Sequence, residues 1–263
     1  MKAVICSSKD VASRNIYELL KRDFGFVQST DFFDDNFVYK REKNIMVLSD
    51  KDTIFINPNS LDADLLVFAS RHKSKSGIPT LTVHTTGVFS SDVRFGGLPF
   101  TLSQTNARVN GFALRKLNDL NNSDFKVSLE VTHHGPVTNK PVVFVEVGSS
   151  LKQWNRIDIC NIVAKVCVSL LNSEIKSSAV PVIGFGGSHY AAKFTDLAVK
   201  GEFDFGHICP KYMIKNLSFD LVKQMVEKTF PKPKLGLIEK NNCSRKVEIK
   251  SWLNDLGVDS RLV

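Results

Sequence analysis

The sequence predicts an α/β fold, with a mixed, largely buried β-sheet flanked by helices. Short apolar runs typical of buried strands alternate along the chain with longer segments of helical periodicity. The chain of 263 residues is 43% hydrophobic and 24% charged, as in an ordinary globular protein. It contains no internal repeat, low-complexity segment or linker of useful length. We therefore expect a single α/β domain over residues 1–263.

The first half of the chain begins with a strand and a helix. Residues 2–6 are a short apolar run, and Asp10 can cap a helix that continues to about Arg22. Residues 65–69 form a continuous apolar run of the kind that is buried on both faces of a sheet. The other elements expected here are strands at 37–39, 45–49, 53–57 and 80–84 and a helix at 103–120.

The second half continues the alternation. The clearest helix is 155–171, in which Cys160 and Cys167 are seven residues apart and so share a face. A strand at 180–185 leads into a glycine-rich turn. The remaining expected elements are strands at 125–132, 141–147, 203–209 and 235–239 and helices at 191–200, 218–229 and 244–256.

The positive charge is unevenly distributed. The chain has 35 Lys and Arg against 27 Asp and Glu, a formal net charge of +8. Residues 1–70 hold nine basic and eleven acidic side chains, whereas residues 71–140 hold nine and four. A basic face attracts polyanions, nucleic acid among them. The alternative is a surface that is cationic only for solubility.

Nothing in the sequence resembles an export or membrane-spanning segment. The longest apolar stretches are interrupted by Glu146 and Lys165 and fall well short of the ~20 residues that cross a bilayer. Five widely spread cysteines without a C-x-x-C motif are typical of reduced thiols. We therefore expect a cytoplasmic protein that does not enter a membrane.

The histidines form the most informative pattern. Most of them sit at the end of a strand or in a polar turn, where ligands bind in open α/β sheets. The six are His72, His84, His133, His134, His189 and His207. A single histidine in such a place is usually capped or solvated, but six of them predict that at least three converge. If the backbone is extended at His133 and His134, only one of this pair faces the site.

Imidazoles can orient or deprotonate water near neutral pH, and they also bind metals. Neither H-E-x-x-H nor C-x-x-C occurs, so the standard zinc signatures are missing. A metal site remains an alternative, because residues two apart on a strand share a face, as His207 and Cys209 would. The candidate ligands are His84, His133, His189, Glu146, His207 and Cys209.

A basic loop and a glycine-rich turn add two further features. The segment from Ser70 through Arg71, His72 and Lys73 to Lys75 combines basic and hydroxyl groups suited to phosphate, unless it is merely a solvated loop. The turn at 184–188 is neither a P-loop nor G-x-G-x-x-G, and we expect it to let backbone approach a ligand or simply to turn the chain. The chain has no G-x-S-x-G, which argues against a serine esterase.

Five motifs, in this order along the chain, resemble the archaeal and plant type of D-aminoacyl-tRNA deacylase. They are Ser70-Arg71-His72-Lys73-Ser74, Thr82-Val83-His84-Thr85-Thr86-Gly87, Thr132-His133-His134-Gly135-Pro136, Glu146-Val147-Gly148-Ser149 and Gly186-Gly187-Ser188-His189-Tyr190-Ala191. The sequence departs from the family pattern at Val88, where Asn is usual, and at Ala192, where Pro is usual.

The resemblance implies an enzyme that hydrolyses the ester between a D-amino acid and the 3′ end of tRNA, and so clears mischarged tRNA. It further implies zinc as a cofactor, a monomer, and a fold similar to nucleoside phosphorylases and peptidyl-tRNA hydrolases.

An aminoacyl ester is already activated, so water, a base and oxyanion donors suffice for its hydrolysis. We expect His133 or His134 to activate the water, and His84 and His189 to hold the substrate carbonyl and amine. The expected substrate- and tRNA-binding residues are Ser70, Arg71, His72, Lys73, Lys75, Thr85, Gly87, Gly186, Gly187, Tyr190 and Lys193.

Three other interpretations stay open at this point. One is a small-molecule enzyme on the same fold, such as a nucleoside phosphorylase or an aminopeptidase-like hydrolase. Another is a non-catalytic RNA-binding module, although phosphate binding alone does not need the histidines. The third is a purely structural zinc site.

Overall fold

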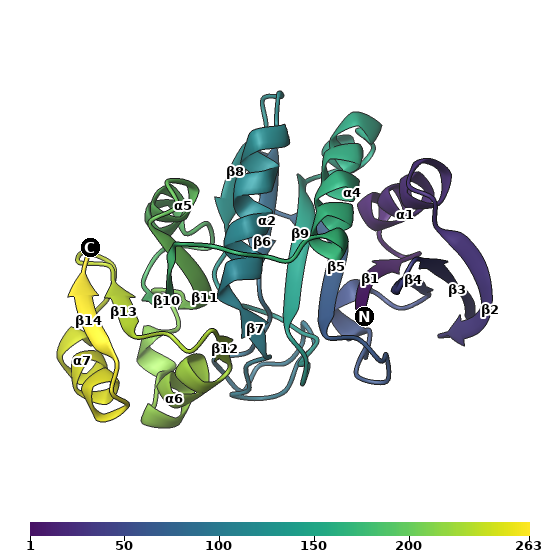
Figure 1. Cartoon of the computed structure of the whole chain (residues 1–263). Coiled ribbons are helices and arrows are strands. Elements are labelled where there is room, and N and C mark those ends of the chain that lie inside the picture. Colours follow the sequence, from purple (N-terminus) through teal and green to yellow (C-terminus); the bar gives the residue numbers. More distant parts are fainter.

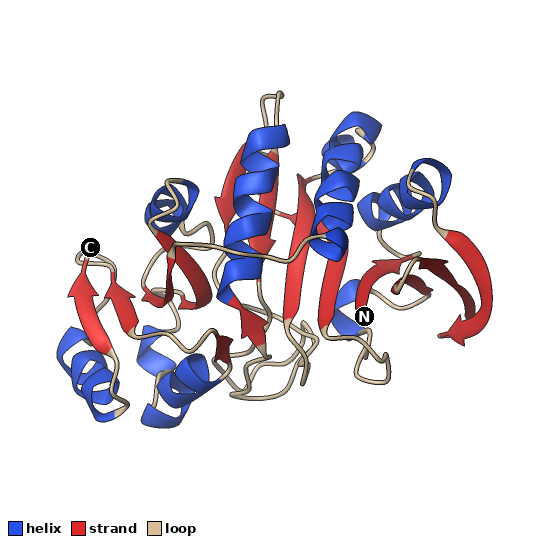
Figure 2. Cartoon of the chain, in the orientation of Figure 1, coloured by secondary structure: helices blue, strands red, loops and turns tan.

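The computed structural model describes all residues, 1–263, and contains one large and one smaller β-sheet with helices packed around them (Figures 1 and 2). The large sheet has eight strands. In spatial order they are β2 (Val27–Phe33), β3 (Asn36–Arg41), β4 (Asn44–Ser49), β1 (Lys2–Ser7), β5 (Leu65–Lys73), β9 (Val142–Ser149), β6 (Thr80–His84) and β8 (Lys126–Leu129). The sheet is mixed, because β6 runs antiparallel to β9 and β3 antiparallel to both its neighbours.

Three helices cover one face of the large sheet: α1 (Val11–Asp23), α2 (Ala107–Leu120) and α4 (Ile157–Asn172). Alternate strand residues such as Val67, Val143 and Val145 join these helices in the largest apolar cluster. As expected, the Asp10 carboxylate caps α1 by accepting from the amide of Ser13. The amphipathic stripes of the helices thus account for the burial of this face.

The opposite face of the central strands holds polar side chains at their ends. Phe68 of β5 and Phe144 of β9 stack there at 4.4 Å between ring centroids. One step further along the same face, Glu146 stands in register with Ser70 on one side and Thr82 on the other. A polar row therefore follows the apolar one directly, at the point where the helices no longer provide cover.

The second sheet is entirely parallel and lies beside the first. Its strands, in spatial order, are β11 (Phe203–Cys209), β10 (Val180–Phe185), β13 (Leu235–Ile238) and β14 (Asp259–Leu262). Its helices are α5 (Ala192–Val199), α6 (Phe219–Glu227) and α7 (Lys246–Asp255). Helix α2 joins the two sheets, since Asn110 donates to the carbonyl of Phe205 and Gly111 leaves room for Asp204.

Short elements complete the chain. They are the paired strands β7 (Thr105–Asn106) and β12 (Thr229–Phe230), helix α3 (Leu151–Trp154), and the 3-10 turns η1 (Thr53–Phe55) and η2 (Ile214–Asn216). No helix combines the length and the apolar character that a bilayer crossing requires.

The α/β class and the mixed sheet are confirmed, and several local expectations are wrong. Residues 53–57 are not a strand, because hydrogen bonds from the amides of Phe55 and Ile56 close the turn η1. The expected strand at 125–132 ends at Leu129, and the helix expected from 103 begins at Ala107. Strands β2 and β14 were not expected, since both are mostly exposed sheet edges with little apolar signal.

Candidate functional site

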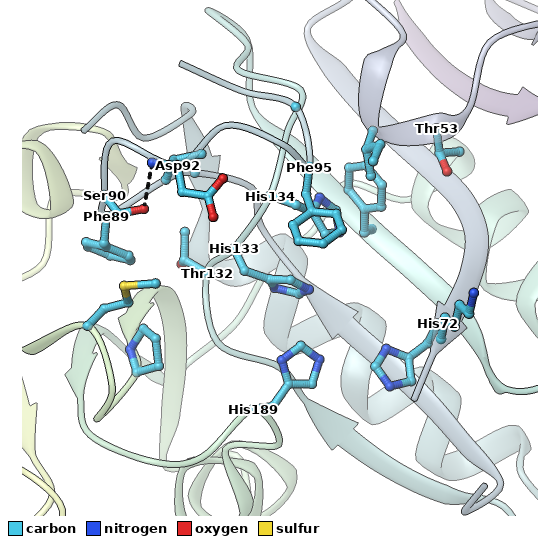
Figure 3. Close-up of a pocket in the computed structure, with 18 of the residues that line it drawn as sticks. Thr53, His72, Phe89, Ser90, Asp92, Phe95, Thr132, His133, His134 and His189 are labelled. Carbon is cyan, nitrogen blue, oxygen red and sulfur yellow. Dashed lines mark hydrogen bonds between the residues drawn. The ribbon is translucent and has the colours of Figure 1, made fainter. Parts of the chain in front are cut away.

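A pocket of about 570 Å³ opens where the carboxyl end of β5 and the segment that follows β6 meet the loops around the second sheet. Figure 3 shows His72, His133 and His189 directed toward one another in it, with Phe95, Ser90 and Asp92 on other parts of the wall. The polar row of the large sheet supplies its floor, through Glu146.

Five of the six histidines converge here. The ring of His133 lies 4.3 Å from His84, 4.3 Å from His134 and 4.7 Å from His189, between centroids. His72 stacks on His189 at 5.3 Å. These side chains come from β5, β6 and two separate turns, so the sheet topology alone brings them together.

His133 and His134 both face the cluster, and the expectation that only one does is wrong. The rings leave opposite sides only from an extended backbone. His134 instead has φ of 41°, in the left-handed region, which turns its ring back to within 4.9 Å of His84.

Two buried carboxylates connect the imidazoles. Glu130 approaches His189 at 2.8 Å, His72 at 3.0 Å and His133 at 3.4 Å. Glu146 lies 3.6 Å from Nε2 of His84 and accepts a 2.6 Å hydrogen bond from the Ser70 hydroxyl. Both carboxylates are almost completely shielded from solvent.

The carboxylates and imidazoles determine each other's protonation. Burial opposes a charged ring, but Glu130 and Glu146 outweigh it and raise the pKa of His72 to about 11. Burial likewise opposes a charged Glu146, yet His84 and His72 lower its pKa to about 2. The pKa of Glu130 falls well below its usual value, because His189 and His72 offset the effect of burial. Both carboxylates are therefore ionised.

The remaining rings divide into two kinds. Glu146 outweighs burial at His84 and raises the pKa of that ring. Burial and the neighbouring His84 lower the pKa of His134 to about 4, and burial with His134 and His84 lowers the pKa of His133 well below normal. The two buried carboxylates thus favour the charged forms of His72 and His84, while His133 and His134 remain neutral.

The tautomers of three rings follow from their backbone contacts. Nδ1 of His84, His133 and His134 meets the carbonyl oxygens of Thr85 (3.1 Å), Val131 (2.7 Å) and Gly135 (2.6 Å), respectively. A carbonyl only accepts, so Nδ1 carries the hydrogen in each ring and Nε2 is left for another ligand. Metal-binding histidines are usually oriented in this way.

The donor set suits a transition metal. Ligand atoms lie within 4.8 Å of one another in three groups: His84–His133–His134, His72–Glu130–His189 and His84–Glu130–Glu146. Nε2 of His84 is buried without a hydrogen-bond partner, and the buried oxygens of Glu130 have only imidazole nitrogens as partners. Such atoms fit a cation. Nε2 of His84 can bind either a proton or a metal cation, but not both at once.

Two of the expected metal ligands lie elsewhere. Both nitrogens of His207 are engaged, by the hydroxyl of Thr132 at 3.2 Å and the carbonyl of Ser103 at 3.0 Å, and burial lowers its pKa to about 3. Cys209 is buried in a separate apolar cluster with Cys243. Neither belongs to a metal-binding group or lines the pocket, which corrects both assignments.

Arg71 forms a fixed cationic edge of the pocket. Its guanidinium pairs with Asp52 at 3.0 Å, donates to the carbonyl of Lys9, and lies over the ring of Trp154. Lys73 also lines the pocket and is exposed. Of the other expected cations, Lys75 and Lys193 are exposed but do not line it.

Of the remaining expected binding residues, Gly87 lines the pocket, whereas Tyr190 contacts a histidine from outside it. The hydroxyl of Tyr190 lies 2.9 Å from Nε2 of His72. The Gly87 amide donates to the carbonyls of His133 and His134 and so shapes their turn. Gly186 and Gly187 are bonded to β11 and the residues after it and do not line the pocket.

Sequence reasoning missed Glu130 and the far wall. Glu130 was the only acid in an expected apolar strand and precedes His133 by three residues, which is the signal that could have revealed it. The far wall comes from the loop at 88–101, with Phe89, Ser90, Asp92 and Phe95, and from Tyr212 after β11. No sequence motif marks these residues.

Comparison with known proteins gives a consistent result. A family model described as D-aminoacyl-tRNA deacylase matches residues 59–260. A D-aminoacyl-tRNA deacylase of Thermococcus kodakarensis is 34% identical over 87% of each chain, and one of Pyrococcus abyssi is 32% identical over 98% of each. The crystal structure of AF0625, a conserved protein of unknown function, superposes with a TM-score of 0.90 at 26% identity, over 100% of this chain and 95% of that one.

Proposed function

Because this chain belongs to the D-aminoacyl-tRNA deacylase family, we propose that it hydrolyses the ester that joins a D-amino acid to the 3′ end of tRNA. The observation that carries this proposal is the convergence of five histidines at the pocket, four of them paired with Glu130 or Glu146, beside the cationic edge at Arg71. A pocket of this kind can activate water next to a phosphate-bearing substrate.

In the proposed reaction, water attacks the ester carbonyl. Nε2 of His133 or His134 accepts the proton of the water, because the Nδ1 hydrogen of either ring is held by a backbone carbonyl. The bond from the carbonyl carbon to the tRNA oxygen then breaks, and that oxygen takes up a proton. The products are the free D-amino acid and tRNA with its terminal hydroxyl restored.

His84 and His189 position the substrate in this scheme. His189 is the most exposed of the five rings at 37% side-chain exposure, so it can meet the substrate amine or carbonyl at the pocket mouth. His84 is buried and fixed between Glu146 and the carbonyl of Thr85. Its Nδ1 hydrogen is taken by that carbonyl and its Nε2 is the atom that would bind a metal, so His84 would act on the substrate carbonyl only indirectly, by positioning that metal.

We propose zinc as the cofactor. The residues that would hold it are His84 and whichever of His133 and His134 does not act as the base, with Glu130, Glu146, His72 and His189 around them. Zinc in such a site polarises a carbonyl and lowers the pKa of water. The buried Nε2 of His84, which has no hydrogen-bond partner, supports this assignment.

The tRNA would bind along the cationic edge. Arg71 is preorganised by Asp52 and Trp154, so little conformational entropy is lost when it meets a phosphate. Lys73 adjoins it at the pocket, and Lys75 and Lys193 extend the positive surface beyond it. Selection of the D-enantiomer would come from a wall that excludes the L side chain.

A tRNA substrate indicates the compartment in which the protein acts. We propose that one domain, residues 1–263, acts as a monomer in the cytoplasm, where tRNA is charged. The five cysteines are free and buried, as is usual for thiols in a reducing compartment.

Incubation of the purified protein with D-tyrosyl-tRNA and L-tyrosyl-tRNA, with and without a chelator, tests this function. We expect release of D-tyrosine, much slower release of L-tyrosine, and loss of activity with chelator. Equal cleavage of both esters would contradict the proposed chiral selection. Cleavage of neither ester would contradict the proposed function.

A further inference from the structure

The loop at 88–101 carries an aromatic ring on the rim of the pocket. Its two ends are held together, since the amide of Val88 donates to the carbonyl of Thr101 and that of Phe100 to the carbonyl of Ser90. Phe95 lies at the far end of this loop and lines the pocket, yet it is 64% exposed. Figure 3 places its ring beside His134, on the pocket wall away from Ser90 and Phe89.

Close backbone contacts at glycines hold this loop against the turn that carries His133 and His134. The amide of Gly135 donates to the carbonyl of Phe95 at 3.0 Å. A Cβ at Gly135 would come within 2.2 Å of the amide nitrogen of Gly97, and a Cβ at Gly96 within 2.1 Å of the carbonyl oxygen of Ile54. Because the backbones touch directly, the position of Phe95 is fixed relative to His133 and His134.

Among the exposed large apolar side chains of the molecule, only Phe95 and Tyr212 line this pocket. Burying such a ring inside the protein would normally stabilise the fold, so its exposure leaves apolar surface available to a partner. Arg71 and Lys73 line the same pocket. Aromatic rings beside cations are how proteins hold single-stranded nucleic acid.

We propose that Phe95 is the stacking platform for the terminal base of the tRNA 3′ end, an inference that rests on the proposed function. The scissile ester is on the terminal ribose, so the base lies one sugar ring away from the histidines. Phe95 lies on the rim, outside the Glu and His cluster. The phosphates that precede the terminal nucleoside then face Arg71 and Lys73.

The amino acid side chain occupies a different part of the pocket. It is attached next to the carbonyl carbon, and so lies closer to the histidines than the base does. Phe89 and Phe144 line that deeper region and are buried, at 2% and 0% exposure. Phe95 therefore reads the nucleic acid, and its loss affects substrates with any D-amino acid alike.

The test compares Phe95→Ala with Phe95→Trp, which restores a stacking face. Dissociation constants are measured for uncharged tRNA and for the same tRNA without its terminal nucleotide. KM and kcat are measured with D-tyrosyl- and D-alanyl-tRNA. The matched controls are Phe55→Ala and Leu98→Ala, which remove exposed apolar side chains of 54% and 56% exposure that do not line the pocket.

We expect Phe95→Ala to weaken binding of full-length tRNA about tenfold and to raise KM equally for both esters, with kcat within a few-fold. Binding of the shortened tRNA stays unchanged, Phe95→Trp binds like the wild type, and both controls are neutral. An active enzyme whose Phe95→Ala variant binds both tRNAs normally overturns the inference but leaves the proposed function intact.

Two further results also count against the inference. A KM change confined to one D-amino acid would show that the ring contacts the side chain instead of the base. A wild-type protein that neither binds tRNA nor cleaves the ester would overturn the proposed function, and this inference with it.

Discussion

Glu130 and His189 lie 2.8 Å apart, although they come from different parts of the chain and only the carboxylate is buried. The same carboxylate reaches His72 at 3.0 Å on its other oxygen. A single acid therefore links a ring at the pocket mouth to a ring in the interior. The Glu130 carboxylate therefore couples the exposed ring of His189 to the buried charged groups of the site.

Glu130→Gln tests this link. The amide preserves the volume but removes the charge that faces His72 and His189, so we expect kcat to fall 10- to 100-fold. Loss of one partner of a buried pair should also lower the free energy of unfolding by about 3–5 kcal/mol, measured by urea denaturation. Glu174→Gln, at an exposed pair, is the control and should change stability by less than about 1 kcal/mol. Unchanged activity and stability in Glu130→Gln would contradict the proposed role.

Metal analysis separates the two sets of candidate ligands. His84→Ala, and whichever of His133→Ala and His134→Ala does not remove the base, should lower the zinc that remains bound after dialysis, because each removes an Nε2 donor. Cys209→Ala should keep full zinc, since Cys209 lies in another cluster. Loss of zinc from Cys209→Ala, with zinc retained in the three histidine variants, would reverse the assignment.

His207 should make the protein sensitive to acid. Its pKa is about 3 in the folded state because of burial, and near 6.5 when unfolded. Only the unfolded chain takes up this proton between those values, so stability is complete above pH 6.5 and is lost as the pH falls toward 3. The expected loss is up to about 1.4 kcal/mol per pH unit. Urea denaturation from pH 7 to pH 4 should show a shallower decline in His207→Gln than in the wild type, and parallel declines would exclude this role.

Gly135→Ala should displace the loop at 88–101. The new Cβ would lie 2.2 Å from the amide nitrogen of Gly97, so one of the two backbones must move. We expect KM for D-aminoacyl-tRNA to rise several-fold while far-UV circular dichroism stays native. In Gly201→Ala, a Cβ meets no atom within 4 Å, but the residue has a left-handed φ of 75° away from the pocket, so stability should fall while KM matches the wild type. A wild-type KM in Gly135→Ala would mean that the loop does not depend on this contact.

The central part of the fold could be predicted from local sequence because its signals are strong. The apolar run at 65–69 and the helical stripe at 155–171 appear as β5 and α4. Edge strands β2 and β14 bury little, so their pairing depends on neighbours that lie far along the chain. The separation of the strands into two sheets has no local signature either.

The sequence predicts which histidines belong to the site, but it does not predict how they are arranged. His72 and His84 converge because both lie on the sheet face that carries Glu146, although β5 and β6 run in opposite directions and share no carboxyl edge. The left-handed backbone at His134 depends on the turn, and the importance of Glu130 appears only when three imidazoles surround it. His207 occupies a similar place in the sequence, but hydrogen bonds to Thr132 and Ser103 make it structural.

The most direct test of the histidine cluster is the rate of D-tyrosyl-tRNA cleavage by four variants under single-turnover conditions. The variants are His84→Ala, His133→Ala, His134→Ala and His189→Ala. If the ester is hydrolysed in this pocket, at least one of them should lose 100-fold or more, on the order expected for removal of a general base or an oxyanion donor, while retaining the fold. Rates within a few-fold of the wild type in all four would show that the reaction takes place elsewhere.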